Sequence, residues 1–336
     1  MKETTKEGFG KALLELGEKK DIIVLAGKSE RFAEKFPQKF IQCSADTIGI
    51  ATGIALQGKT VFAEAQDKNL DKIRNACINN ADVKIIGTGD ISLLRKLPIT
   101  IIIPADSAEA QKATIAAAIT KGPAYIQLSR EKTPTITKEF ILGRAEILRE
   151  GADCTIVACG KMLHEALAAA EKLAKQDIEC TVINNHTIKP MDKHTILSSA
   201  RITKCIVASE ELGSTVAEII SQHNPVPMRI TGGTYKEIIR AVKEAIRQKC
   251  ENVKEGAGVS PELQFKVHDG STISSIAGLQ KALVHMDDVA FAHHVNENKN
   301  DFASWIKDVF KDEALANQAA KRKTKLSIAS LLANRK

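Results

Sequence analysis

Apolar and polar residues in the first 140 positions alternate between a helical and a strand-like pattern. Phe9, Leu13 and Leu16 recur at three- and four-residue spacing, which predicts a helix, and the apolar run 22–25 predicts a strand. Further expected elements are strands at 83–86, 99–103 and 124–128, and helices at 49–56 and 108–120. Apolar runs bounded by turn residues are typical of buried parallel strands, so this alternation predicts a doubly wound α/β domain.

A second α/β domain is expected after a Thr-rich stretch around Pro134. Its predicted strands are 155–158, 180–184, 205–209 and 228–230, and its predicted helices include 165–175 and 238–248. The polar segment 252–258 has no periodicity, which predicts a hinge. The expected organisation is therefore a first domain at 1–135, a second at 141–252, a linker at 253–262 and a small α-rich module at 263–336.

The C-terminal module has its own pattern. A strand is expected at 263–267, a tight turn at Asp269-Gly270, and helices at 276–286 and 301–310, followed by a basic amphipathic helix at the end of the chain. The string from Phe291 to Ile306, with the only tryptophan, resembles a small uncharacterised module appended to other archaeal and bacterial proteins. That resemblance implies no particular activity.

Composition is that of a soluble globular protein. Hydrophobic residues make up 43% and charged residues 26% of 336, and no run of 18 apolar residues predicts a membrane span. The first seven residues have no apolar signal core, so a cytoplasmic location is expected. The seven cysteines are an odd number without a C-x-x-C pair, which favours buried free thiols in a reducing compartment over a metal or disulfide framework.

Several charged or glycine-containing features carry a plain structural interpretation as well as a functional one. The basic run at 321–325 has no accompanying recognition motif, so a solvated helix end is favoured and nucleic acid is not an expected partner. His293-His294 are adjacent and point in different directions, which favours packing over metal binding. A turn is favoured over a phosphate cradle at Gly232-Gly233-Thr234, and the net charge of +7 is read as a solvated basic surface.

Four stretches resemble the C-terminal half of transketolases. They are IGIATGIA at 48–55, LPITIIIPAD at 97–106, GPAYIQLSR at 122–130 and VINNHTIKPMD at 182–192. The resemblance runs in order through residues 1–250 and is strongest to the separate C-terminal subunit of some archaea and bacteria. It implies a pyrimidine-binding domain followed by a transketolase C-terminal domain, with thiamine diphosphate held between two chains.

The resemblance also implies a site that this sequence has changed. In the family a glutamate binds the aminopyrimidine ring and drives its deprotonation chemistry, and its position here is Ser44, which cannot supply the charge. Asp46 is a weak substitute two residues later. The family's aromatic platform is reduced to Phe62, followed by polar residues that include Gln66, and these four residues form the expected degenerate pyrimidine pocket.

Other segments depart from the family in the same direction. The glycine-rich loop with a substrate-facing histidine is missing after Gly87, and Ala26-Gly27-Lys28 stands where acidic interface residues are usual. The segment 209–214 lacks the family's histidine-containing insert. Arg130 matches a strand-end arginine of the family and is the one candidate substrate-binding residue.

These changes favour a non-catalytic structural or regulatory subunit, with no cofactor expected. Its partner would be a second copy of the chain or a transketolase N-terminal subunit. The alternative is an active C-terminal subunit of a split transketolase that transfers two-carbon ketol units between sugar phosphates, and that alternative requires thiamine diphosphate with magnesium. A third hypothesis is a scaffold whose last 75 or so residues bind nucleic acid.

Overall fold

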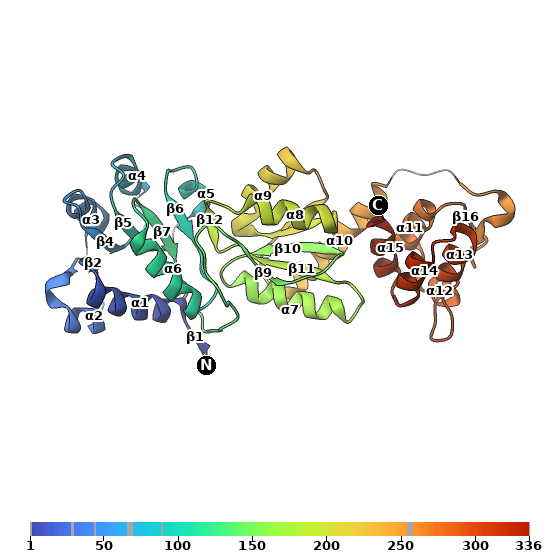
Figure 1. The fold of residues 1–336 in the computed structure, drawn as a ribbon, viewed down its shortest axis with the longest axis horizontal. Coiled ribbons are helices and arrows are strands. Elements are labelled where there is room, and N and C mark those ends of the chain that lie inside the picture. Colours follow the sequence, from blue (N-terminus) through green and yellow to red (C-terminus); the bar gives the residue numbers. More distant parts are fainter. Residues whose placement is uncertain are drawn as a thin grey trace. The chain divides into compact units, whose positions relative to one another are not determined.

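The structure is a computed structural model that describes residues 2–27, 30–43, 45–65, 70–88, 90–253 and 258–335. The chain divides into two compact units (Figure 1). The first contains residues 1–148, 158–164 and 184–195, and the second contains 149–157, 165–183 and 196–336. No helix in the described part of the chain is long and apolar enough to cross a membrane.

A seven-stranded sheet forms the centre of the first unit. Its order is β12-β6-β7-β5-β4-β2-β3, and all neighbouring pairs are parallel except β12 with β6. The strands are β2 (Ile22–Ala26), β3 (Phe40–Gln42), β4 (Thr60–Glu64), β5 (Val83–Gly87), β6 (Thr100–Ile102), β7 (Ala124–Gln127) and β12 (Thr187–Lys189). Two shorter strands, β1 (Lys2–Glu3) and β8 (Thr133–Pro134), pair antiparallel.

The helices of this unit are α1 (Thr5–Lys19), α2 (Glu30–Lys35), α3 (Thr47–Ala55), α4 (Leu70–Ile78), α5 (Ile91–Leu94) and α6 (Ser107–Ile119), with a 3₁₀ turn η1 (Pro37–Lys39). Helix α1 begins with a capping box between Thr4 and Glu7. It lies so close to α6 that a Cβ on Gly8 would come within 1.9 Å of the Ser107 carbonyl oxygen. Close packing of α1 on α6 therefore requires glycine at this position.

The second sheet has five strands in the order β14-β13-β10-β11-β9. The strands are β9 (Glu146–Arg149), β10 (Cys154–Ala158), β11 (Cys180–Asn184), β13 (Ile206–Ser209) and β14 (Met228–Thr231). Strands β10, β13 and β14 are parallel neighbours, so their carboxyl ends meet at one edge. The accompanying helices are α7 (Met162–Ala174), α8 (Lys193–Thr203), α9 (Glu210–His223) and α10 (Tyr235–Glu251).

The C-terminal residues are mainly helical and belong to the second unit. They form η2 (Pro261–Leu263), the hairpin β15 (Phe265–Lys266) and β16 (Thr272–Ile273), and helices α11 (Ile276–His285), α12 (Asp288–His294), α13 (Asp301–Phe310), α14 (Glu313–Ala320) and α15 (Lys325–Ala333). The prediction of an amphipathic terminal helix is wrong, because every residue of α15 from 327 to 333 is buried.

The α/β fold class predicted from the sequence is confirmed, and most predicted elements agree with the observed ones within a few residues. Strand β12 was not predicted. It lies 85 or more positions after β6 along the chain yet pairs with that strand, so the first unit includes residues far beyond its predicted end. Residues 254–257 of the predicted linker lie outside the described residues.

Candidate functional site

Asp46 lies at the start of helix α3 and is committed to local contacts. Its backbone is left-handed, with φ of 49°, and its carboxylate accepts a hydrogen bond from the Gly49 N–H at 3.2 Å. The same carboxylate pairs with Lys72 Nζ at 2.6 Å, and 52% of the side chain is exposed. The hydrogen bond with Lys72, helped by the Gly49 N–H, lowers the pKa of Asp46.

Phe62 lies inside the core of the first unit. Its side chain is completely buried, and its ring centroid is 6.1 Å from that of Phe9 on α1. A ring in this position supports the contact between sheet and helix and presents no face to a ligand. Ser44 and Gln66, the other two residues of the expected pyrimidine pocket, lie outside the described residues.

The aminopyrimidine of thiamine diphosphate needs a carboxylate in a dry pocket. Among the described residues of the expected pocket, Asp46 offers a half-exposed carboxylate that already caps a helix and pairs with a lysine. Phe62 offers no exposed ring. These two side chains therefore do not fit the aminopyrimidine.

Arg130 follows strand β7 and is exposed. Strand β3 precedes Asp46. Three strands, β5, β4 and β2, lie between β7 and β3 in the sheet. Arg130 and Asp46 therefore follow strands that are not neighbours. The adjacent Ser129 is anchored, since its backbone N–H donates to the Thr5 hydroxyl at 2.6 Å.

A cavity of about 440 Å³ lies between α1, the start of α2 and the end of β4. Its floor is apolar, with Phe9 and Leu13, and charged residues surround it. The charged residues are Glu3, Lys6, Glu7, Lys11, Arg31 and Glu64. Lys6 pairs with Glu64 at 3.3 Å and Lys11 with Glu3 at 2.6 Å.

The carboxyl end of a parallel strand is the usual place for ligands in α/β folds, so this cavity can take a small polar molecule. Sequence analysis did not single out these residues. The charges on α1 recur at three- and four-residue spacing, a pattern that also describes an ordinary solvated helix face. Glu64, at the end of β4, becomes informative only when Lys6 is seen beside it.

The glycine turn before α10 is closed to anions. The Glu237 carboxylate accepts from the Thr234 backbone N–H at 2.6 Å, and the Glu165 carboxylate accepts from the Tyr235 N–H at 2.7 Å. Two carboxylates already use the N–H groups that a phosphate would need. The geometry agrees with a turn at Gly232-Gly233.

Of the two adjacent histidines, His294 is part of the C-terminal core and His293 is exposed. His294 is 6% exposed, its Nδ1 lies 3.0 Å from Asp301 Oδ2, and its Nε2 accepts from the His268 N–H at 3.0 Å. No group of three or more His, Cys, Asp or Glu side chains in the described ranges is arranged to hold a metal ion.

Glu109 on α6 is a buried acid that sequence analysis did not single out. Its Oε1 accepts from Asn184 Nδ2 at 2.7 Å and its Oε2 from the Ala105 N–H at 2.6 Å. Burial raises the pKa of Glu109 to about 8, with the charges of Asp106 and Glu146 acting in the same direction and the two hydrogen bonds opposing them. Glu109 therefore joins α6 to the end of β11 as a largely neutral acid at pH 7.

Comparisons with known proteins agree on one family. The family described as "Transketolase, C-terminal domain" matches residues 143–253. The 6-deoxy-6-sulfo-D-fructose transketolase subunit SqwH of Clostridium sp. (strain MSTE9) is 34% identical over 70% of this chain and 92% of that protein. Human transketolase is 34% identical over 60% of this chain but only 38% of its own length.

A solved structure gives the same result. A chain described as "Split gene transketolase, inactive beta4 tetramer" superposes with a TM-score of 0.70 and 33% identity, covering 73% of this chain and 98% of that one. This α/β fold with parallel strands is the fold of that split-gene transketolase chain. The chain belongs to the transketolase family.

Proposed function

We propose that this chain is the C-terminal subunit of a split transketolase assembly in which its own pyrimidine site is degenerate. Its role is structural or regulatory, and it binds no cofactor through the usual glutamate. The coverage of a complete transketolase subunit, 92% of SqwH, supports the subunit assignment. The proposed domains are 1–135 and 141–252, joined by the linker 253–262 to the segment 263–336.

The observation that carries this proposal is the environment of Asp46. Ser44 stands at the family's glutamate position, and Asp46 is the nearby carboxylate that could replace it. Its Oδ1 contacts both the Gly49 N–H and Lys72 Nζ on a half-exposed surface. A carboxylate with a lowered pKa and two partners is a helix cap and not a buried proton relay.

The test is calorimetry of thiamine diphosphate and magnesium binding to this chain mixed with the transketolase N-terminal chain from the same organism. We expect a stable complex in which this chain adds nothing to cofactor affinity. The N-terminal chain alone is the matched control. Micromolar binding that requires this chain would contradict the proposal and establish a rebuilt site.

The alternative is an active split transketolase that moves two-carbon units between sugar phosphates. One observation favours it: the cavity at the end of β4 is lined by three basic and three acidic side chains and has room for a small polar substrate. The calorimetric result separates the two functions, because only the active enzyme needs thiamine diphosphate and magnesium held with the help of this chain.

The proposed location is the cytoplasm. All seven cysteines are described and all are free thiols, and six of them are buried. Free thiols in this number are typical of a reducing compartment.

A further inference from the structure

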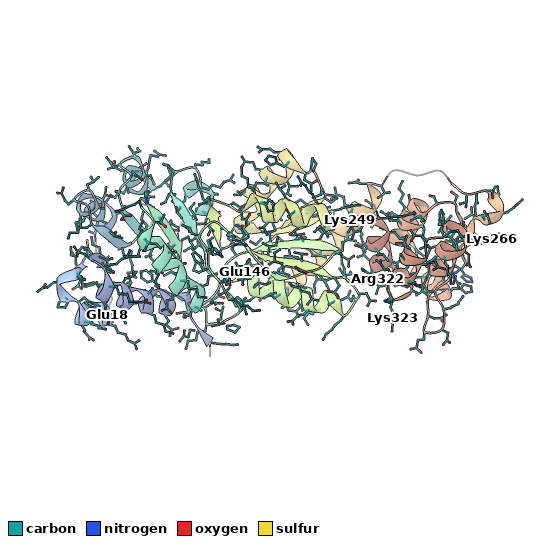
Figure 2. The ribbon with its side chains drawn as sticks, in the orientation of Figure 1. Glu18, Glu146, Lys249, Lys266, Arg322 and Lys323 are labelled. Atoms are coloured by element: carbon teal, nitrogen blue, oxygen red, sulfur yellow. The ribbon has the colours of Figure 1, made fainter. Side chains whose placement is uncertain are left out.

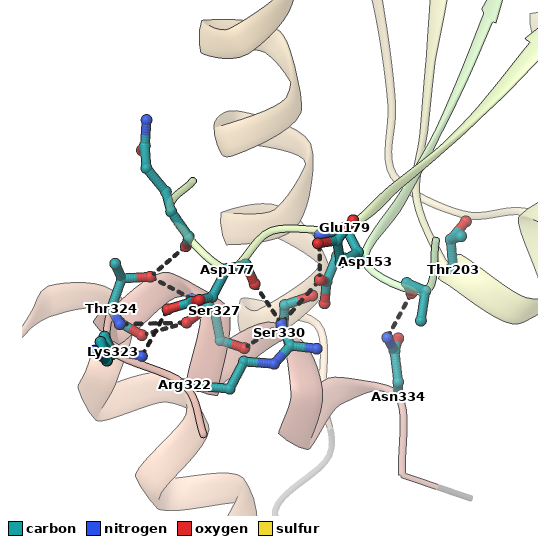
Figure 3. A network of polar contacts seen from close by, with 12 residues as sticks. Asp153, Asp177, Glu179, Thr203, Arg322, Lys323, Thr324, Ser327, Ser330 and Asn334 are labelled. Carbon is teal, nitrogen blue, oxygen red and sulfur yellow. Dashed lines mark hydrogen bonds and ion pairs between the residues drawn. The ribbon is translucent and has the colours of Figure 1, made fainter. Parts of the chain in front are cut away.

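A buried ion pair joins the C-terminal segment, residues 258–335, to the second sheet (Figure 3). Asp153 lies immediately before β10 and is fully buried. Its Oδ2 accepts from Arg322 Nη1 at 2.9 Å and from the Glu179 N–H at 2.8 Å. Arg322 also donates to the Asp177 carbonyl oxygen at 2.7 Å, so one guanidinium contacts the starts of two strands.

A buried lysine adds a second link. Lys249 on α10 is 4% exposed, and its ammonium donates to the carbonyl oxygens of Asp153 (2.8 Å) and Thr203 (3.0 Å). The segment supplies the other acceptors, Ser330 Oγ at 2.9 Å and Asn334 Oδ1 at 3.3 Å. Figure 2 shows Lys249 and Arg322 at this junction. Without the segment, a nearly buried ammonium would lose half of its acceptors.

Apolar packing accompanies these polar contacts. Helix α15 is buried from Ser327 to Ala333 and contacts both α10 and α11. A helix that is buried around its whole circumference belongs to a core and not to a surface. Gln280 on α11, 1% exposed, donates to the Cys250 carbonyl oxygen at 2.9 Å, so the core of the segment continues into α10.

All of these contacts are made at one edge of the sheet. Asp153, Glu179 and Thr203 precede strands β10, β11 and β13, so the segment lies at the amino ends of these strands. Ligands of open α/β sheets bind at the carboxyl ends. The segment is therefore not placed to act as a lid over that sheet's ligand edge.

We propose that the C-terminal segment is a permanent clamp on the amino ends of β10, β11 and β13. It folds and opens together with the transketolase C-terminal domain as one cooperative unit, and it is not a module that moves or recruits a partner independently. Arg322 and Lys249 are the residues that hold it. Two side chains of the basic run are engaged, since Arg322 pairs with Asp153 and Lys325 pairs with Asp288 at 2.7 Å, whereas Lys321 and Lys323 are exposed.

The experiment uses the full chain with Arg322→Met, and Lys321→Met as the matched control, because Lys321 is the exposed neighbour in the same run. The readouts are alkylation of Cys154, Cys205 and Cys250, all fully buried in the native chain, and hydrogen exchange in β10 and α15. Breaking the pair leaves a buried carboxylate without its charge partner, so we expect thiol alkylation to rise by about 100-fold, together with exchange in both elements. Lys321→Met should behave as the wild type.

Two results would overturn the proposal. Faster exchange in α11–α15 with fully protected thiols would show that the segment opens alone, and no change in either readout would show that Arg322 does not hold it. If Arg322→Met fails to fold, Ser330→Ala is the milder variant. It removes one acceptor of Lys249, and the same two readouts should then rise by about 5-fold.

Discussion

At the scale of single residues, burial shifts the pKa values of two titratable groups in the first unit in opposite directions. Burial raises the pKa of Glu109 to about 8 and lowers the pKa of His186 to about 4. The contribution of Glu109 to stability is complete below its unfolded pKa near 4.5 and is lost as the pH rises through 8. The contribution of His186 is complete above 6.5 and is lost as the pH falls through 4.

We expect Glu109→Gln to remove the loss of stability above pH 6.5. Glutamine cannot ionise, whereas wild-type Glu109 keeps its proton in the folded state and releases it on unfolding, which lowers the free energy of unfolding by up to about 1.4 kcal/mol per pH unit below pH 8. The measurement is the free energy of unfolding in urea at several pH values from 6.5 to 8. Glu139→Gln, an exposed acid, should keep the wild-type slope. An unchanged slope in Glu109→Gln would show that the native acid is already ionised.

At the scale of elements, helix α3 depends on its N-cap residue, Asp46. Asp46 accepts from the Gly49 N–H while its own backbone is left-handed, a combination that aspartate and asparagine tolerate and alanine does not. A Cβ at position 49 would lie 2.6 Å from Asp46 Oδ1, so a larger residue there would displace the capping carboxylate. Gly49 therefore suits the observed helix start.

We expect Asp46→Ala to lower the thermal midpoint by about 2–4 °C. Asp46→Asn should lower the midpoint much less, because asparagine keeps both the cap and the backbone preference. Differential scanning fluorimetry measures the thermal midpoints of both variants and of the wild type. Complex formation with the N-terminal chain should be unaffected. Loss of thiamine diphosphate binding or of turnover in the Asp46→Ala complex would instead support the active enzyme.

At the scale of the whole molecule, apolar side chains are exposed on α3 and at the ends of α3 and α4, whereas the rest of the exposed surface of α4 is polar. Ile50 is 43%, Leu56 55% and Ile78 73% exposed, and a Cβ on Gly53 would meet no atom within 4 Å. Isolated exposed apolar residues are ordinary, but several on two adjacent helices indicate a surface for another chain. A specific interface of this kind buries at least about 1,000 Å².

We expect the chain to be larger than a 36.4 kDa monomer at micromolar concentration, alone or with the N-terminal chain. Light scattering after gel filtration measures this. Ile50→Lys should reduce the assembly, because a charge would be placed in an apolar interface. Val289→Lys, at a 75% exposed position in the C-terminal segment, is the matched control. Monomer under both conditions would contradict the proposed subunit role.

Much of the fold follows from local pattern. The apolar runs of β2, β5, β7 and β11 and the spacing of apolar residues in α1 and α13 are properties of neighbouring residues, so the sequence alone determined those elements. The family resemblance also rests on short stretches of sequence, and it predicts Ser44 at the family's glutamate position with Asp46 as a weak substitute. The cavity at the end of β4 could not be predicted from local pattern, since Lys6 and Glu64, which line it, are 58 positions apart in the sequence.

The sequence by itself therefore determined the α/β fold class and the family, whereas the altered glutamate position at Ser44 stays a prediction. Only the tertiary structure decided what each charge does. Arg322 was read as part of a solvated basic run, and its partner Asp153 lies 169 positions earlier. The same holds for Lys249 and for β12, because the energy of a buried polar group depends on partners that folding brings together from distant parts of the chain.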